Sequence, residues 1–295
     1  MTTHALSAER FEADRPHLRA VAYRMLGSLS EAEDAVQEAW LRAARADVAG
    51  VENLSGWLTT VVGRVCLNML RSRRARREEP LDVPVTDRAA GPGDGGDPEE
   101  EALLADSVGV ALLVVLDTLG PAERLAFVLH DLFAVPFDDI APLIEKTPAA
   151  TRQLASRARR RVRGSAPASA AVDMARQREV VGAFLAATRG GDFEALVSLL
   201  HPDVVLTADR FVVPTPEPIV VGGGRAVAEG AMAAMGRARF TGLALLDGRV
   251  GLAMAAQGRL RLVLTFTVTA DGITGIDVVA DRERLEGIEV AVLAA

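Results

Sequence analysis

A segment rich in proline, glycine and aspartate interrupts the chain and argues against one continuous hydrophobic core. Residues 78–98 include the run from Gly91 to Pro98 and carry few large apolar side chains. A stretch with so little to bury is typical of a flexible linker, here an acidic one. A shorter joint, rich in alanine and serine, follows at 165–171. The chain is therefore predicted to form separate modules, at residues 1–77, 99–164 and 172–290.

The composition excludes several kinds of site. Cys66 is the single cysteine, so a disulfide within the chain is excluded. The four histidines are scattered, and no Cys/His pair has the spacing of metal ligands. The N-terminus lacks a charged and then apolar leader, and no apolar run reaches the ~18 residues of a membrane span. We therefore expect a cytoplasmic protein with no metal, no cofactor and no membrane contact.

Positive charge is concentrated in two short stretches, although the formal net charge is −7. Residues 71–77 hold five arginines and residues 152–163 hold six. An acidic run at 94–101 lies between them. Local basic patches, rather than overall charge, are typical of a protein that binds nucleic acid.

Residues 9–77 have helical periodicity. Ser30 and Glu33 are spaced as a capping box, which predicts that a helix starts there. Apolar residues at i, i+3, i+4 and i+7 then give this helix a buried stripe. Asp34, Gln37 and Glu38 lie off the stripe, on a face that either meets solvent in an ordinary bundle or binds a partner.

The next predicted helix begins near Asn53 and runs into the first arginine stretch. Thr60, Arg64 and Asn68 share its polar side. Arginine, asparagine and threonine on one face can contact phosphates and bases. A solubilising surface with a basic tail is the alternative, and the residues alone favour neither.

A helix-turn-helix is predicted at residues 137–163. A first helix ends near Ile144, and Thr147 and Pro148 suit the cap and the first position of a second helix. The outward side of this second helix is polar and cationic, at Arg152, Gln153, Ser156, Arg157 and Arg160. Arginine and glutamine can contact base edges in the major groove, while further arginines bind phosphates.

Four stretches, in order along the first 165 residues, resemble the extracytoplasmic-function sigma factors of bacterial RNA polymerase. They are residues 23–43, 57–71, 119–124 and 151–159. The resemblance implies that the first module is the sigma domain 2 helical bundle and that the second is sigma domain 4. It also implies promoter-specific transcription initiation without enzymatic activity, with promoter DNA and the β′ and β subunits of core polymerase as partners.

The resemblance also assigns roles to single residues. Contact with core polymerase is implied for Asp34, Gln37 and Glu38. Contact with the melted −10 element is implied for Asn53, Thr60, Arg64, Asn68 and Arg71. Contact with the −35 element is implied for Arg152, Gln153, Ser156, Arg157 and Arg160. The chain departs from many relatives at Glu145-Lys146, where glycine is common in the turn, and at Asn68, where aspartate is common.

The periodicity changes from residue 172 onward. Two helices are predicted, at 172–189 and 192–200. Apolar stretches with strand-like alternation follow, separated by the turn dipeptides Asp247-Gly248, Gln257-Gly258 and Asp271-Gly272. Such turns between alternating runs predict an antiparallel meander and an α+β module.

This third module resembles the SnoaL-like domains of the nuclear-transport-factor-2 superfamily, which are cone-shaped α+β folds around a pocket. The stretches that carry the resemblance are residues 183–187, 191–196, 200–204 and 222–225. A subgroup of sigma factors carries such a domain as a regulator, marked by Asp-Gly-Gly-Gly-Arg/Lys. Here Val221 replaces the aspartate, while the regulatory candidates Gly222, Gly223, Gly224 and Arg225 are intact. The triplet is either an anion-binding turn or a tight bend, and a small ligand in the pocket would shift the regulation.

Two other functional classes stay open from the sequence. One is a stand-alone helix-turn-helix regulator that never binds polymerase. The other is a small cyclase or isomerase fused to a DNA-binding part, with His201, Asp203 and Asp209 as acid/base groups at the mouth of the cone. The promoter sequence, the inducing signal and the sign of the C-terminal effect do not follow from the residues.

Overall fold

The computed structural model describes residues 6–48, 50–77, 109–164, 171–213 and 215–293. The predicted linker at 78–98, the acidic run at 94–101 and nearly all of the joint at 165–171 lie outside these ranges. The described residues form two compact units, one made of 6–77 with 116–160 and one made of 109–115 with 161–293. None of the helices in these ranges is both long enough and apolar enough to cross a bilayer.

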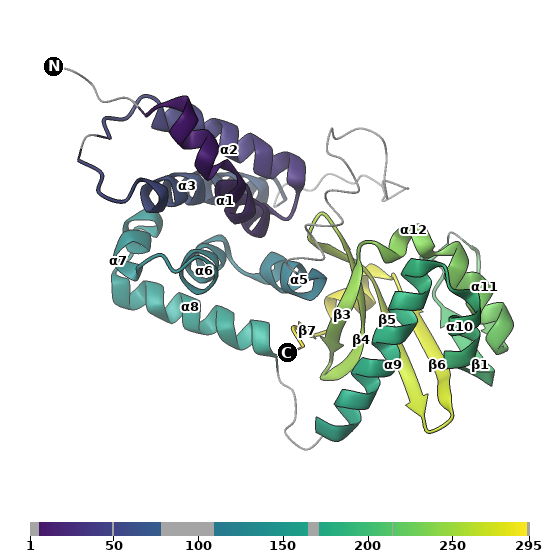
Figure 1. Ribbon diagram of the computed structural model, residues 1–295. Coiled ribbons are helices and arrows are strands. Elements are labelled where there is room, and N and C mark those ends of the chain that lie inside the picture. The colour runs from purple at the N-terminus through teal and green to yellow at the C-terminus, as the bar shows by residue number, and fades with distance from the viewer. Residues whose placement is uncertain (1–5, 49, 78–108, 165–170, 214, 294–295) are drawn as a thin grey trace. The chain divides into compact units, whose positions relative to one another are not determined.

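The first unit begins with three packed helices (Figure 1), which are α1 (Ala8–Leu26), α2 (Leu29–Ala43) and α3 (Leu54–Arg77). Ser7 caps α1, because its hydroxyl accepts a hydrogen bond from the Arg10 amide at 3.3 Å. Gly27 ends α1 in the left-handed conformation, with φ of 79°, and its N–H donates to the Tyr23 carbonyl. The buried stripes of the three helices then make one core, which includes Phe11, Leu18, Val36, Leu58 and Val62.

The predicted start of α2 was wrong by two residues. The cap is Ser28, whose hydroxyl accepts from the Glu31 amide at 3.4 Å, and the helix begins at Leu29. Ser28-x-x-Glu31 has the same spacing as the pair Ser30 and Glu33, so spacing alone could not choose between them. Gly27 determines that Ser28 is the cap, because its left-handed backbone ends α1 and leaves Ser28 as the first extended residue.

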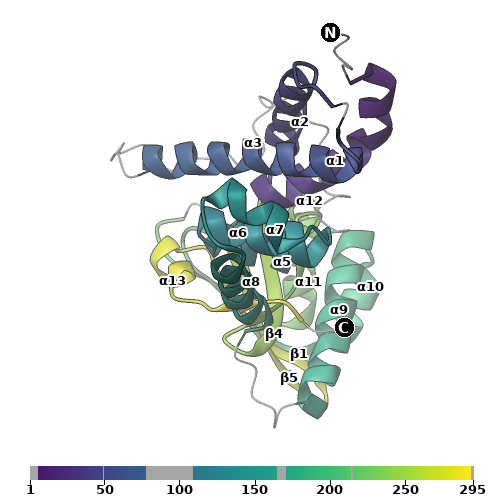
Figure 2. The same ribbon diagram turned by 90° about the vertical axis from the view of Figure 1, so that its left-hand side faces the viewer.

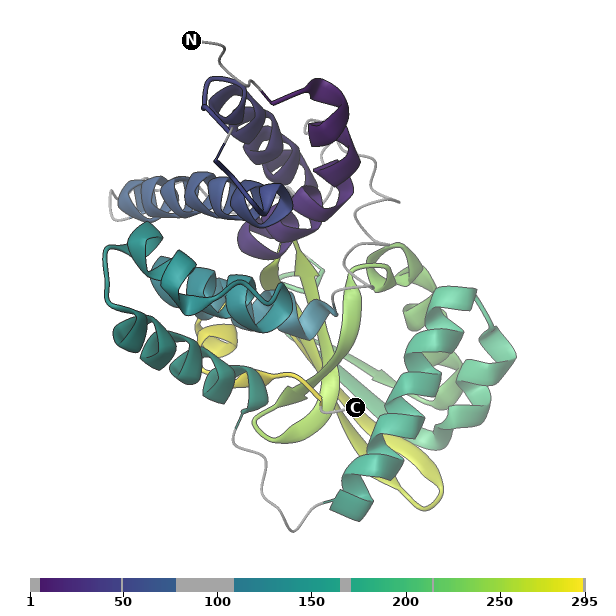
Figure 3. The ribbon, with the colours of Figure 1, turned by 60° about the vertical axis from the view of Figure 1, so that its left-hand side comes forward.

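The other described helices before residue 164 include the predicted helix-turn-helix (Figures 2 and 3). In order they are α5 (Val110–Thr118), α6 (Pro121–Phe127), the π-helix η1 (Val128–Leu132), α7 (Phe137–Ile140), the 3₁₀-helix η2 (Ala141–Ile144) and α8 (Pro148–Arg163). The first helix of the motif tightens after Ile140 because Pro142 has no N–H for an α-helical bond. The Thr147 hydroxyl accepts from the Ala150 amide at 3.2 Å, which confirms the predicted cap of α8.

The second unit contains a seven-stranded sheet in the order β2-β1-β6-β5-β4-β3-β7. The strands are β1 (Leu200–Ala208), β2 (Ile219–Gly222), β3 (Thr241–Leu246), β4 (Arg249–Ala256), β5 (Arg259–Thr269), β6 (Gly272–Val279) and β7 (Val290–Ala291). Strands β3 to β6 form the predicted antiparallel meander. Asp247 and Gly248 both have positive φ, as the tight hairpin turn requires. The parallel pairing of β1 with β6 was not predicted.

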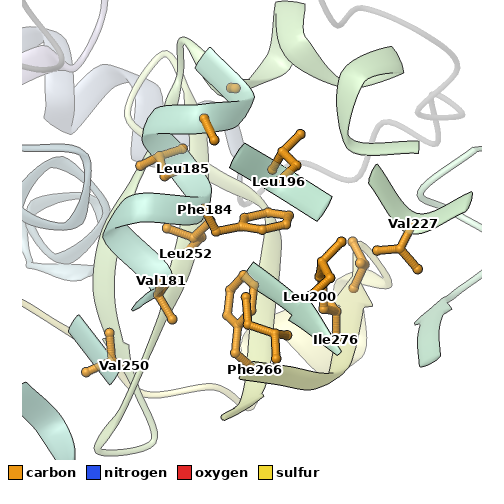
Figure 4. Close-up of a cluster of buried hydrophobic side chains, with 14 of the residues drawn as sticks. Val181, Phe184, Leu185, Leu196, Leu200, Val227, Val250, Leu252, Phe266 and Ile276 are labelled. Carbon is orange, nitrogen blue, oxygen red and sulfur yellow. The ribbon is translucent and has the colours of Figure 1, made fainter. Parts of the chain in front are cut away.

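Among the described residues, the same unit also contains the helices α9 (Ala171–Gly190), α10 (Phe193–Leu199), α11 (Gly224–Ala233), α12 (Met235–Ala238) and α13 (Arg282–Glu286). Figure 4 shows the apolar core between the sheet and the helices. Phe184 of α9 meets Phe266 of β5 edge-on, with ring centroids 5.4 Å apart. Leu196 and Val227 add to this core from α10 and α11. The α+β prediction is thereby confirmed.

A smaller core covers the other face of the sheet. Ala244, Leu246, Ala253 and Val263 pack there against Ala111 of α5. The contact with α5 is close, because a Cβ built on Gly242 would lie 2.9 Å from the Val110 Cβ. In the same unit, the Val292 amide donates to the Val162 carbonyl at 2.9 Å. The start of α5 and the last turn of α8 therefore fold together with the sheet.

Candidate nucleic-acid interface

The outer side of α8 is polar, exposed and cationic. Its inner stripe, Thr151, Leu154, Ala155 and Ala158, is buried. All five residues predicted to contact the −35 element are exposed, namely Arg152, Gln153, Ser156, Arg157 and Arg160. The helix is therefore mounted as a recognition helix requires, with its apolar stripe in the core and its donors toward solvent.

Three arginines of α8 are held by neighbours in the same unit. The Arg157 Nε lies 3.2 Å from Glu123 Oε1, and the Arg159 Nε lies 2.5 Å from Asp131 Oδ1. The Arg152 guanidinium lies over the Phe137 ring, 5.3 Å from its centroid. Holding these side chains lowers the rotamer entropy that binding would otherwise remove.

The polar side of α3 has two kinds of residue. Arg64, Asn68 and Arg71 are exposed on successive turns. Asn53 and Thr60 already bind the backbone: Asn53 Oδ1 accepts from the Gly56 amide at 2.9 Å, and the Thr60 hydroxyl donates to the Trp57 carbonyl at 2.7 Å. Asn53 is thus the N-cap of α3, in agreement with the predicted start of this helix near Asn53.

A pocket of about 380 Å³ opens between the end of α2 and the middle of α3. It brings together two of the predicted residues, Arg64 and Asn68, with Arg42 and Trp57. An aromatic ring beside guanidinium and amide groups suits a base with its phosphate. The sequence had not assigned Arg42 or Trp57 to this site, because these residues line one pocket only through the packing of α2 and α3.

The polar face of α2 is exposed where it was expected to be. Asp34 and Gln37 are exposed, and the Glu38 carboxylate is half-exposed. Glu38 Oε1 lies 2.8 Å from the Arg42 Nε one turn later. The three side chains lie at i, i+3 and i+4 and so form one patch on the helix.

Arg124 of α6 is a buried cation in the first unit. Its Nε and Nη2 donate to the Arg24 carbonyl near the end of α1, at 3.2 and 3.1 Å. Its Nη1 lies 3.7 Å from Asp117 Oδ1. Burial lowers its pKa to about 10, while Asp117 opposes that shift, so the guanidinium is charged at neutral pH. Arg124 therefore satisfies an α1 carbonyl from a helix about 100 residues later.

Cys66 has no reactive character. It is fully buried in α3, and burial raises the pKa of its thiol to about 12. The thiolate is the nucleophilic form, so this side chain is a small apolar core residue. Across the described ranges, no group of three or more His, Cys, Asp or Glu side chains could hold a metal ion.

The glycine triplet of the second unit forms a tight bend. Gly223 has φ of 93°, and its N–H donates to the Val204 carbonyl at 2.8 Å before α11 begins at Gly224. The Arg225 guanidinium lies over the Phe193 ring, 5.1 Å from its centroid. Gly222 is the last residue of β2. The backbone contact to β1 stabilises the bend.

Two of the three acid/base candidates of the second unit, His201 and Asp209, bind the backbone through their side chains. Asp209 Oδ2 accepts from the Ala280 and Asp281 amides, each at 2.8 Å. His201 Nδ1 lies 3.1 Å from the Asp203 amide. These contacts explain Asp209 and His201 as structural groups at the ends of β1.

Known proteins are similar to this chain over both helical segments. The family model "Sigma-70 region 2" matches residues 10–76, and the model "Sigma-70, region 4" matches residues 109–162. A segment of 204 residues, 69% of the chain, is 43% identical to "ECF RNA polymerase sigma factor SigJ" of Mycobacterium tuberculosis. It covers 65% of that protein, slightly less than two thirds of its length.

A further protein and a crystal structure are similar to this chain. "Probable ECF RNA polymerase sigma factor SigI" of Mycobacterium tuberculosis is 40% identical over 204 residues, which are 69% of this chain and 70% of that protein. The crystal structure of the extracytoplasmic function sigma factor SigJ of Mycobacterium tuberculosis aligns with 95% of this chain and 99% of its own. That alignment has 34% identity and a TM-score of 0.43.

Proposed function

Because this chain belongs to the extracytoplasmic-function sigma factors of RNA polymerase, we propose that it directs core polymerase to promoters through three surfaces of its helices. Sigma-70 regions 2 and 4 bind core polymerase and promoter DNA, and both are present. The observation that carries the proposal is α8: its buried stripe fixes five exposed polar residues on one side of a helix-turn-helix. Its site of action is the cytoplasm, where core polymerase works.

In this proposal α8 contacts the −35 element. Arg152, Gln153, Ser156, Arg157 and Arg160 face the major groove. A bidentate arginine or glutamine contact discriminates against a wrong base by about 1–3 kcal/mol. The other arginines of the helix bind phosphates, which fix the register and make the affinity salt-dependent.

The α3 pocket takes the melted −10 strand. Trp57 offers a ring on which an unstacked base can lie, and Arg42 and Arg64 flank it. Stacking of a base on an aromatic ring is worth about 1–3 kcal/mol, which would favour the unpaired strand over the duplex. Asn68 and Arg71 continue the contact along α3, while Asn53 and Thr60 support it by capping and bonding the backbone.

The α2 patch binds core polymerase. Asp34, Gln37 and Glu38 are acidic or polar. In sigma factors of this family, the corresponding residues bind a basic element of the β′ subunit. A partly exposed acidic patch adds specificity and association rate more than affinity. The stand-alone regulator is the competing function, because it needs no such patch.

The second unit is proposed to be a SnoaL-like regulatory domain. The start of α5 and the last turn of α8 fold with its sheet, so a change in this unit would act directly on both ends of region 4. The turn at Gly222–Arg225 is the proposed regulatory element. Binding of a small ligand stays a prediction. The backbone contacts of His201 and Asp209 count against the enzyme alternative.

Run-off transcription with purified core polymerase and the promoter of this protein's own gene tests the proposal. The full chain, a version ending near Gly164 and one ending near Gly287 are compared. Transcription that depends on any version supports sigma function, and a difference between versions gives the sign of C-terminal control. DNA binding without transcription from any version would favour the stand-alone regulator.

A pull-down with core polymerase tests the α2 patch. The triple variant Asp34→Ala, Gln37→Ala and Glu38→Ala should lose binding. The double variant Glu9→Ala with Asp14→Ala is the matched control, because it also removes two negative charges, but from α1. Equal binding by both variants would remove the α2 assignment.

A further inference from the structure

We propose that Glu123 of α6 is a positioning residue for promoter recognition, which orients Arg157 of α8 toward a guanine of the −35 element. The inference rests on the proposed function, since it assumes that α8 enters the major groove. It adds a residue that makes no DNA contact itself. Glu123 acts through Arg157, from a helix that lies outside the helix-turn-helix.

The geometry of the pair carries the inference. Arg157 Nε lies 3.2 Å from Glu123 Oε1, across 34 positions of sequence. The Glu123 side chain is only 12% exposed, while the Arg157 side chain is 54% exposed. The carboxylate is therefore fixed in the protein surface, and the guanidinium projects from it into solvent.

The point of attachment leaves the useful edge of the guanidinium free of Glu123. Arginine has five N–H donors in a planar fork, and the Nε–H is used by the carboxylate. The two terminal nitrogens can then donate together to O6 and N7 of guanine, the commonest specific contact in the major groove. An arginine held at its Nε therefore presents its two terminal nitrogens in a fixed direction.

The pair also has an electrostatic cost that separates specific from non-specific binding. A carboxylate beside Arg157 offsets part of its attraction for any phosphate. This weaker attraction lowers the affinity for all DNA. The orientation of Arg157, in contrast, raises the affinity only for the site with the matching base. Glu123 therefore raises the ratio of specific to non-specific affinity rather than affinity itself.

A second pair in the same unit provides a matched comparison. Arg159 Nε lies 2.5 Å from Asp131 Oδ1, with Arg159 35% exposed and Asp131 20% exposed. Arg159 is not among the five residues of the outward face. The variants Glu123→Gln and Asp131→Asn each remove one negative charge and one arginine partner, but only the first affects the predicted recognition face.

The experiment uses the full chain with core polymerase. Wild-type holoenzyme first enriches its −35 motif from a library of random DNA. Binding is then measured for that site and for each single base-pair change in it, and the ratio of the two dissociation constants is the discrimination. We expect one G·C pair with a discrimination of about 5- to 150-fold for the wild type.

Glu123→Gln should lower discrimination at that pair by about 2- to 12-fold, the value of ordering one long side chain. Asp131→Asn should leave it unchanged, and both variants should strengthen binding to non-specific DNA by similar factors. In an Arg157→Ala background, Glu123→Gln should have no further effect on discrimination. Arg157→Lys keeps the charge without the fork, so it should lose discrimination at the same pair even if the Glu123 variant folds poorly.

Three results overturn the inference. They are equal effects of Glu123→Gln and Asp131→Asn on discrimination, an effect of Glu123→Gln that persists without Arg157, and unchanged discrimination in Arg157→Lys. Failure of the proposed function looks different, because wild-type holoenzyme would then enrich no motif at all.

Discussion

The turn of the helix-turn-helix holds a glutamate in a backbone conformation that favours glycine. Glu145 follows η2 with φ of 55° and ψ of 45°, in the left-handed region. An L-residue there brings its Cβ close to the following carbonyl oxygen, which costs roughly 1–2 kcal/mol. The Glu145 side chain is exposed, so the substitution Glu145→Gly removes little packing.

The expected gain is the difference of two opposing effects. Glycine removes the steric cost of roughly 1–2 kcal/mol in the folded chain. It also gives the unfolded chain more freedom, which costs about 0.4–1 kcal/mol. The local free energy of unfolding should therefore rise by about 0.5–1 kcal/mol.

Native-state hydrogen exchange measures this change locally, at the amides of α7 and α8. A local probe is needed because a chain with two units need not unfold in one transition. Glu145→Ala is the matched control, since it removes the same charge but keeps the Cβ. If Glu145→Gly protects these amides no better than Glu145→Ala, the strain argument is refuted.

Three further predictions follow from single contacts. Asn53→Ala should destabilise α3 by about 1 kcal/mol, because it removes the N-cap of the helix. Asn53→Asp should keep the cap, but its negative charge should weaken promoter binding. Unfolding and DNA-binding measurements on both variants would check this. Ala111→Asp places a carboxylate in the smaller core of the sheet, so the free energy of unfolding of the second unit should fall by about 2 kcal/mol or more. Thr118→Asp, at the exposed end of α5, should leave that free energy unchanged. Hydrogen exchange of the sheet amides measures both effects. Cys66 has a folded pKa of about 12, raised from 9.0, so its stabilising contribution is complete below pH 9 and is lost as the pH rises above it. Between pH 7.5 and 10 the wild type should lose about 1.4 kcal/mol more than Cys66→Ala in urea unfolding, and equal losses would contradict the assignment.

The local features of the first unit could be predicted because they depend on neighbours in the chain. The cap at Thr147, the turn at Glu145 and the apolar stripe of α8 all involve residues within about two helical turns of each other. The same holds for the hairpin turns of the meander. Periodicity and turn chemistry report such short-range relations directly.

Other parts of the candidate site depended on contacts that periodicity does not encode. Trp57 and Arg42 face one pocket only because α2 and α3 pack together. Arg124 binds an α1 carbonyl and Glu123 binds Arg157 across 100 and 34 positions of sequence. A charged residue on a helix looks the same in sequence whether it meets solvent, a carbonyl or a second charge.

By itself, the sequence determined the division into helical and α+β parts, the helix-turn-helix and the cationic side of α8, because each follows from local spacing and composition. Only the tertiary structure decided that Ser28 rather than Ser30 caps α2, that β1 runs parallel to β6, and that the start of α5 and the last turn of α8 fold with the sheet. These outcomes depend on which distant surfaces bury each other. Burial is set by the three-dimensional arrangement of the whole unit, and no short window of the chain contains it.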